Sequence, residues 1–467
     1  MKWQLAVIAI LLLIPSFLIP YELSNVYTFF KQIQGQTRDG IDHLQAAAAI
    51  FHNTPNAGVM SYLDIGKLRQ VEADIDSAHA DFAALNDTFA HKAAISLAAS
   101  FWPTQINTIR ALGHIAEDGT VAGQQVLKML RDVAPSITLA LQKSASSTTD
   151  APLTPYITPV AYQEINTTLD GVTPLIERMI QNARGLTLNV LPISSKQQKT
   201  IASMLSLLPM IDTDLQQWSV LHAPLAWLMG IGGQRTFLVE PMDTAELRAT
   251  GGFTGQFGEL VLNGGHVGPI KLANIGLYEE DHTYEGSSPP DPTVYPKVVG
   301  QLAPGLYANW WPIPNFGMRD ANLSADFPTS ARIIMDRYSY EFGRNVDGVI
   351  MFTPRVIEDV LHVTGPIAIP AYHQVVTEYN LVDVLHYYQL DNRGIYQEEH
   401  IEGVKDTQLA RKLFTQRVTA ALMNAVTHLP LNQMLPLANE ILQSMKTKDL
   451  QVYVTNSQAE DLIGKYG

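Results

Sequence analysis

Two short segments of the 467-residue chain concentrate residues that could bind an anion or a metal ion. The first, Glu246–Phe253, reads ELRATGGF and places an arginine beside paired glycines. Such glycines allow a tight turn whose backbone N–H groups approach a ligand closely. The planar guanidinium of Arg248 can bind a phosphate or carboxylate through two parallel hydrogen bonds. Arg248 is therefore a phosphate-binding candidate, and the further ligand-binding candidates here are Glu246, Thr250, Gly251 and Gly252.

The second segment, Met318–Pro328, reads MRDANLSADFP and offers a cation, two carboxylates and an amide before a predicted helix. Carboxylate oxygens are hard ligands that suit Mg²⁺, and a bound Mg²⁺ would bridge phosphate groups. In this segment Arg319 is a second phosphate-binding candidate and Asn322 is a ligand-binding candidate. Asp320 and Asp326 are candidate metal ligands.

Both segments also have a purely structural interpretation. Arg248 and Glu246 could form an ion pair that only stabilises the turn, and Asp326 is a favourable N-cap for the helix that follows. The spacing of the residues alone does not choose between a binding site and structural contacts.

Between these segments, residues 276–320 form a long stretch that contains seven prolines and several aromatic residues. Loops of this length inside a compact domain tend to be lids or binding loops. The aromatic content predicts an ordered loop that packs over another part of the protein. Trp310 and Trp311 are the ligand-binding candidates of this loop, as a wall or lid over a bound ligand.

Several classes of function are excluded by what the sequence lacks. It contains no phosphate-binding P-loop, no HExxH zinc motif and no GxSxG nucleophile motif. Cysteine is absent, which excludes disulfides and thiolate chemistry. The formal net charge is −14, and no Lys/Arg cluster offsets it. We therefore expect no nucleic-acid partner, because phosphate contacts need concentrated positive charge.

Short β-rich runs alternate with helical patterns from residue 233 to residue 467. This alternation predicts a mixed β-sheet domain covered by helices. A helix is expected after Asp326, another from Thr353 to Gly365, and a long one that begins at Asp406. The predicted strands are Arg235–Glu240, Gln256–Leu262, Val346–Phe352, Ile367–Pro370 and Leu450–Thr455.

Residues 22–232 have helical periodicity almost throughout. Apolar residues three and four apart form stripes near Leu68–Phe89, Ile165–Leu186 and Ile201–Leu215. Such stripes place apolar side chains on one face that a neighbouring helix must cover. We therefore expect a helical stalk or antiparallel bundle in this region.

The N-terminus contains an uncharged apolar run, Leu5–Pro20, between Trp3 and Tyr21. Its length and flanking aromatics favour a transmembrane anchor over residues 1–21. A cleaved signal peptide and a buried soluble helix are the alternatives, and the run lacks small residues in a cleavage pattern. The predicted fold class is therefore α + α/β: a transmembrane helix, a helical stalk and a sheet domain. The predicted location is the cell membrane, with a single pass and most of the chain extracytoplasmic.

The two segments resemble motifs of an uncharacterised bacterial family, the domain of unknown function four-zero-one-two. Its ELRxTGGFxG run corresponds to Glu246–Gly255, and its RDxNxxxDFP run corresponds to Arg319–Pro328. Its DGVI strand corresponds to Asp347–Ile350, and Thr364–Pro366 also fits. The resemblance covers about residues 235–466. Family members tend to continue further, which implies that this chain is a fragment lacking a C-terminal part.

A more distant resemblance concerns the LytR–CpsA–Psr proteins, which are membrane-anchored transferases of cell-wall glycopolymers. It implies that Arg248 and Arg319 hold phosphates and that Asp320 and Asp326 hold Mg²⁺. Catalysis would then consist mainly of charge neutralisation at phosphorus. The sequence departs from that pattern, because ELR replaces the usual DxR pair and the RxDT and PRD runs are missing.

The sequence thus supports two hypotheses about function. The first is a membrane-anchored envelope protein that binds, and as an enzyme transfers, a lipid-linked glycan or cell-wall polymer through its phosphates. The second is a non-catalytic cell-surface scaffold or adhesion module in which both motifs are structural. Convergence of the arginines and aspartates on one site would favour the first, and separate ion pairs would favour the second.

Overall fold

The computed structural model describes residues 19–52, 63–91, 99–146, 153–191, 195–280, 291–311 and 314–466. The chain divides into two compact units, which are considered separately below. One comprises Met1–Thr138 and Val160–Val220, and the other comprises Leu139–Pro159 and Leu221–Gly467.

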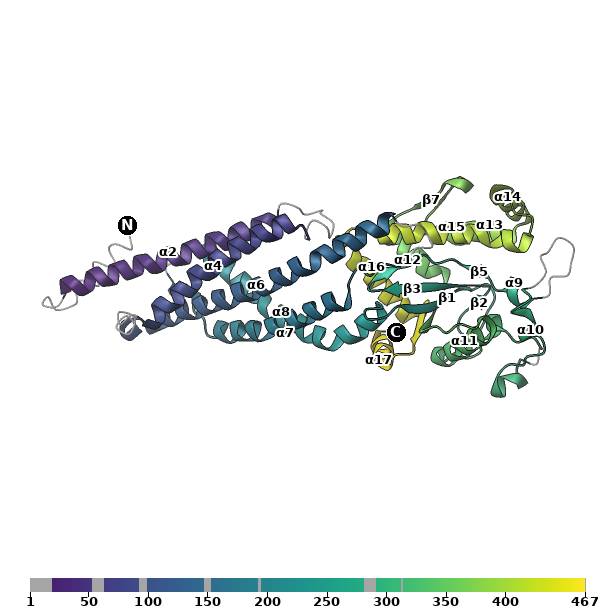
Figure 1. The fold of residues 1–467 in the computed structure, drawn as a ribbon, viewed down its shortest axis with the longest axis horizontal. Coiled ribbons are helices and arrows are strands. Elements are labelled where there is room, and N and C mark those ends of the chain that lie inside the picture. The colour runs from purple at the N-terminus through teal and green to yellow at the C-terminus, as the bar shows by residue number, and fades with distance from the viewer. Residues whose placement is uncertain are drawn as a thin grey trace. The chain divides into compact units, whose positions relative to one another are not determined.

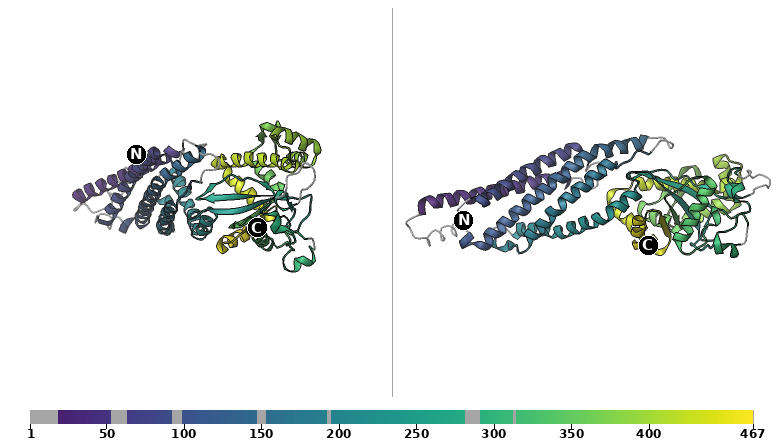
Figure 2. Two further views of the ribbon diagram at one scale, coloured as in Figure 1. Left: turned by 45° about the vertical axis from the view of Figure 1, so that its right-hand side comes forward. Right: turned by 60° about the horizontal axis from the view of Figure 1, so that its bottom comes forward.

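The first unit consists of long helices that lie side by side (Figure 1 and Figure 2). Two of the predicted apolar stripes are buried, as Phe82 in one helix and Ile176 in another show. The third stripe is only partly covered, because Leu208 is buried while Met204 is 62% exposed. The helices are α2 (Ile19–His52), α4 (Ile65–His91), most of α6 (Pro103–Ser146), α7 (Pro159–Ala183) and most of α8 (Ser195–Leu228), with a 3₁₀ turn η1 at Leu188–Val190.

The second unit is built around a mixed sheet with the strand order β4-β3-β1-β6-β9. The β1–β6 pair is parallel and the other pairs are antiparallel, which confirms the predicted mixed sheet. Two further short strands pair with this sheet, β2 with β1 and β5 with β3, and β7 and β8 form a separate two-stranded sheet. The strands are β1 (Arg235–Asp243), β2 (Phe253–Thr254), β3 (Gln256–Asn263), β4 (His266–Val267), β5 (Ala273–Asn274), β6 (Gly348–Phe352), β7 (Ile367–Ile369), β8 (Gln374–Val376) and β9 (Leu450–Val454).

Helices cover the sheet, as the alternating pattern predicts (Figure 1). The period-2 alternation of a strand sends Leu238 of β1 into the core formed with α11, and sends Phe237 toward α17. The helices are α9 (Gly276–Glu279), α10 (Tyr295–Val298), α11 (Phe327–Phe342), α12 (Pro354–Thr364), α13 (Leu381–Leu390), α14 (Asn392–Glu402), α15 (Thr407–Thr427), α16 (Leu431–Thr447) and α17 (Ser457–Tyr466), with 3₁₀ turns η2 (Gly305–Asn309), η3 (Met318–Asp320) and η4 (Pro370–Tyr372).

Local sequence signals account for where these helices begin and end. The Asp326 carboxylate accepts a hydrogen bond from the Thr329 N–H at 3.2 Å, so Asp326 caps α11. Gly365 follows α12 with φ of 80°, a conformation that favours glycine. Thr353 occupies the N-cap position of α12, but its hydroxyl donates to Asp449 at 2.8 Å instead of capping the helix.

The predicted transmembrane anchor at residues 1–21 lies outside the described residues, apart from the last three residues, which begin α2. Among the helices that the structure describes, none is both long and apolar enough to cross a membrane.

Candidate functional site

The turn that carries Arg248 follows β1, the central strand of the sheet. Gly251 has φ of 120°, which favours glycine because it has no Cβ. Gly252 lies so close to β1 that a Cβ there would be 2.6 Å from the Asp243 carbonyl oxygen. The paired glycines therefore fold the turn against the strand and fix where the Arg248 side chain begins.

A buried asparagine joins this turn to the second predicted segment. The Asn322 Nδ2 donates to the Thr250 hydroxyl at 3.0 Å and to the Gly252 carbonyl at 2.9 Å. The Thr254 hydroxyl in turn donates to the Arg319 carbonyl at 3.3 Å. Asn322 and Thr250 are both buried, and the contacts observed for them are structural. These hydrogen bonds hold the two segments against each other.

The two predicted arginines converge on one carboxylate. The Arg248 Nη2 lies 3.7 Å from the Asp320 Oδ1, and the Arg319 Nη2 lies 3.6 Å from the Asp320 Oδ2. Arg248 also pairs with Glu246 at 2.7 Å, and Arg319 pairs with Glu280. We call these five side chains the arginine cluster. Two guanidinium groups here face three carboxylates, so the cluster is already compensated in charge.

Burial raises the pKa of the Asp320 carboxyl, while the charges of Arg319 and Arg248 oppose this shift. Asp320 is buried, whereas the side chains of Arg248 and Arg319 are 20% and 25% exposed. The two arginine side chains are therefore partly open to solvent, while the carboxylate that they share is buried.

Aromatic rings border the arginine cluster on the Arg248 side. The Arg248 Cζ lies 5.2 Å from the centroid of the Phe253 ring and 5.3 Å from that of the Trp311 ring, which are cation–π distances. Trp311 also packs against the main core of the sheet domain. Trp310, by contrast, is 83% exposed. Of the two predicted tryptophans, the structure brings only Trp311 into contact with Arg248.

Asp326, the second predicted metal ligand, takes part in none of the ion pairs of the cluster. It is exposed, and its carboxylate accepts hydrogen bonds from the backbone and hydroxyl of Thr329. Over the described ranges, no three His, Asp or Glu side chains come together in a way that could hold a metal ion. Capping of α11 is thus the role that the observed contacts of Asp326 support.

The sequence patterns did not point to three buried glutamates, one of which contacts the backbone of Arg319. Glu240 of β1, Glu279 of α9 and Glu341 of α11 are all at most 5% exposed. Both Glu279 oxygens accept from the Arg319 backbone N–H, at 3.3 and 3.4 Å. Burial raises the pKa of Glu240 to about 8, and the charge of Glu341 adds to this shift. A glutamate inside the apolar strand sequence TFLVEPMD is the signal that could have identified this group.

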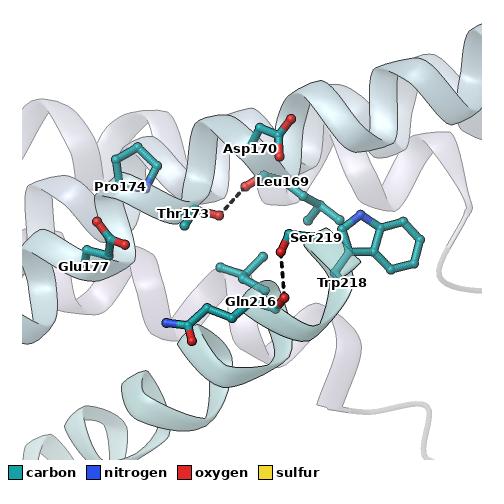
Figure 3. A pocket seen from close by; sticks show the side chains of 9 residues that line it. Leu169, Asp170, Thr173, Pro174, Glu177, Gln216, Trp218 and Ser219 are labelled. Atoms are coloured by element: carbon teal, nitrogen blue, oxygen red, sulfur yellow. Dashed lines mark hydrogen bonds between the residues drawn. The ribbon is translucent and has the colours of Figure 1, made fainter. Parts of the chain in front are cut away.

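The helical unit contains a separate pocket of about 230 Å³ between α7 and α8 (Figure 3). Its hydroxyl groups are directed to their own helices: Thr173 donates to the Leu169 carbonyl at 2.9 Å and Ser219 donates to the Gln216 carbonyl at 2.7 Å. The pocket is smaller than most small-molecule sites, and its polar groups do not converge on a shared centre. The arginine cluster is therefore the better candidate site.

Comparison with known proteins gives one family and no curated relative. Residues 232–389 match the family model described as "Protein of unknown function (DUF4012)". No curated protein matches the chain. The matched segment includes the glycine turn, all five residues of the arginine cluster and the cap of α11, as the sequence motifs predict. Over residues 232–389 this chain is thus similar to a family of proteins of unknown function.

Proposed function

We propose that this protein is a membrane-anchored, extracytoplasmic envelope protein that binds a phosphate-linked glycopolymer at the arginine cluster. The observation that carries the proposal is the convergence of Arg248 and Arg319, from distant parts of the sequence, on the two oxygens of Asp320. A pair of partly exposed guanidinium groups held at a fixed spacing is suited to phosphate oxygens. Transfer of the polymer, which the LytR–CpsA–Psr resemblance implies, would be the enzymatic extension of this binding.

The membrane part of the proposal is supported by the uncharged run Leu5–Pro20. The lipid or sugar part of the ligand would lie against Trp311, the ring that borders Arg248. Mg²⁺ would be held by Asp320 together with the phosphates themselves, since Mg²⁺ in such sites takes few protein ligands and several from substrate and water.

A second candidate function is a non-catalytic scaffold or adhesion module, and the charge balance of the cluster favours it. Each guanidinium already has a carboxylate partner, Glu246 for Arg248 and Glu280 for Arg319. A phosphate would have to displace one of these carboxylates or share its arginine with it. In the scaffold alternative the cluster only stabilises the packing of the glycine turn against η3.

Calorimetric titration of the full chain with inorganic pyrophosphate, with and without Mg²⁺, distinguishes the two functions. Replacement Arg248→Lys keeps the positive charge but removes the planar guanidinium group that can form two parallel hydrogen bonds. We therefore expect the affinity for pyrophosphate to fall about tenfold or more. Arg355→Lys is the matched control, because Arg355 is an exposed arginine of the same unit that pairs with Asp359 outside the cluster. Equal pyrophosphate affinity in both variants, or no binding by the parent protein, would support the scaffold instead.

Asp320→Asn adds a second test in the same titration, because it has opposite effects with and without metal. Without Mg²⁺, removal of a negative charge between the two arginines should strengthen pyrophosphate binding. With Mg²⁺, removal of a hard anionic ligand should weaken it. A change of the same sign under both conditions would show that Asp320 does not bind the metal.

A further inference from the structure

A lysine from a distant helix approaches the glycine turn on which the arginine cluster depends. Lys412 lies in the second turn of α15, and Gln416 lies one turn later on the same face of that helix. The Gln416 Nε2 donates to the Leu272 carbonyl at 2.7 Å, just before β5, which fixes this face of α15 against the sheet. The Lys412 Nζ then lies 3.6 Å from where a Cβ of residue 255 would be.

Two cationic side chains, those of Arg248 and Lys412, border the short segment Phe253–Gly255, and the backbone of Arg319 is hydrogen-bonded to it. Arg248 stacks over the Phe253 ring, and the same ring comes within 3.1 Å of the Cβ position of residue 255. The Thr254 hydroxyl donates to the Arg319 carbonyl. Lys412 borders Gly255 itself. The absence of a side chain at residue 255 leaves room for the ammonium group beside the turn.

Lys412 differs from the two arginines in having no close carboxylate. In the described part of the chain, its electrostatic neighbours are Asp243 at the end of β1, Glu398 of α14 and Arg411 of α15, and none forms an ion pair with it. Burial, reinforced by the charge of Arg411, lowers its pKa to about 8, and the two carboxylates oppose this shift. The residue as a whole is partly exposed. Lys412 is thus a cation that could accept an anion without breaking an existing pair.

We propose that Lys412 is a third ligand-binding cation of this site and contacts the second phosphate of a diphosphate group whose first phosphate lies on the arginine pair. The inference rests on the proposed function and specifies its ligand as a diphosphate in place of a single phosphate. Two phosphates need more hydrogen-bond donors than the arginine pair offers. The ammonium group of Lys412 supplies further donors beside the same turn.

The test compares inorganic pyrophosphate with inorganic phosphate in calorimetric titrations of the full chain at about pH 7. Lys412→Met should weaken pyrophosphate binding about tenfold and leave phosphate binding nearly unchanged, because only pyrophosphate reaches the lysine. Lys446→Met is the matched control, since Lys446 is an exposed lysine of α16 in the same unit. Thermal unfolding of each variant confirms that it remains folded.

Lys412→Arg provides a readout that a merely structural lysine would not alter. Between about pH 7 and about pH 9 the lysine loses its charge while an arginine keeps it. The pyrophosphate affinity of the parent should therefore fall relative to that of Lys412→Arg as the pH rises. Titration of pyrophosphate itself affects both proteins equally and cancels in this comparison.

The possible outcomes separate this inference from the proposed function. If Arg248→Lys weakens pyrophosphate binding while Lys412→Met does not, the diphosphate inference is wrong and the arginine site stands. If Lys412→Met weakens phosphate and pyrophosphate equally, Lys412 only supports the turn, and the inference is also wrong. If the parent protein binds neither anion, the proposed function and the inference both fail.

Discussion

At the scale of single residues, the arginine cluster shows how burial assigns different roles to similar groups. Asp320 is buried and holds two guanidinium groups, while Glu246 and Glu280 pair with the same arginines from more exposed positions. An exposed ion pair contributes little and is easily exchanged for another anion. Glu246 and Glu280 are therefore the carboxylates that a phosphate would displace, whereas Asp320 would remain and orient the arginines.

Glu240 gives a prediction about pH. Its folded-state pKa of about 8 lies above the ordinary value of 4.5, because burial disfavours its charged form. The native protein therefore holds a proton that the unfolded chain releases at neutral pH. The resulting stabilisation is complete below about pH 4.5 and is lost as the pH rises toward about pH 8.

Replacement Glu240→Gln removes this titration while it keeps the size of the side chain. The parent should lose stability relative to this variant between about pH 5 and about pH 8, on the order of a few kcal/mol in total. Urea unfolding across this range measures the difference. Asp461→Asn, an exposed change in the same unit, should show no such trend. A constant difference between Glu240→Gln and the parent at all pH values would contradict the raised pKa.

At the scale of elements, the position of α11 depends on both segments that the sequence analysis singled out. Asp326 caps its first turn, and Gly343, with φ of 67°, follows its last residue. Just upstream, η3 carries Arg319 and Asp320, and Asn322 ties the connection to the glycine turn. The same motif that positions the charged residues thus also begins the helix that covers the sheet.

The capping role of Asp326 leads to a prediction with two variants. Asp326→Ala should lower the free energy of unfolding by about 1 kcal/mol, because the first turn of α11 loses its side-chain acceptor. Asp326→Asn should keep nearly full stability, since asparagine caps helices as well as aspartate does. Urea unfolding measures both. If Asp326→Asn instead weakens Mg²⁺-dependent pyrophosphate binding at unchanged stability, Asp326 is a metal ligand as the resemblance implies.

At the scale of the whole molecule, the N-terminal apolar run and the charge of the chain concern where the protein acts. The net charge of −14 gives no general attraction to anionic ligands, so binding of a phosphate polymer must depend on the local arrangement of a few cations. An anchor at the N-terminus would bring such a ligand close if the ligand is itself attached to a lipid in the same membrane.

Deletion of residues 1–21 tests the anchor. The full chain should partition with membranes or detergent, and the truncated chain should be recovered in the aqueous phase, because the run Leu5–Pro20 is removed. Mass measurement of the full chain after expression distinguishes the anchor from a cleaved signal peptide. Recovery of the intact full-length chain in the aqueous phase would show that the anchor prediction is wrong.

Local sequence signals were enough to predict the longer strands, several helices and the family that residues 232–389 match. Periodicity located the strands β1, β3, β6 and β9, and an aspartate, a proline or a glycine marked the helix ends. The sequence also identified Arg248, Arg319 and Asp320 as candidates, since their side-chain chemistry is evident from residue type alone. Spacing within each segment could not show whether the two segments meet.

Which candidates share a site became clear from the folded structure. It brought Arg248, Arg319 and Asp320 together, gave Asn322 and Asp326 contacts that stabilise the turn and α11, and left Trp310 exposed. It also revealed Lys412, whose distance from the glycine turn depends on how α15 packs against the sheet. Such contacts form between residues far apart in the chain, and the pKa of each group is set by the atoms that surround it after folding. Local sequence patterns predict neither these contacts nor the pKa values.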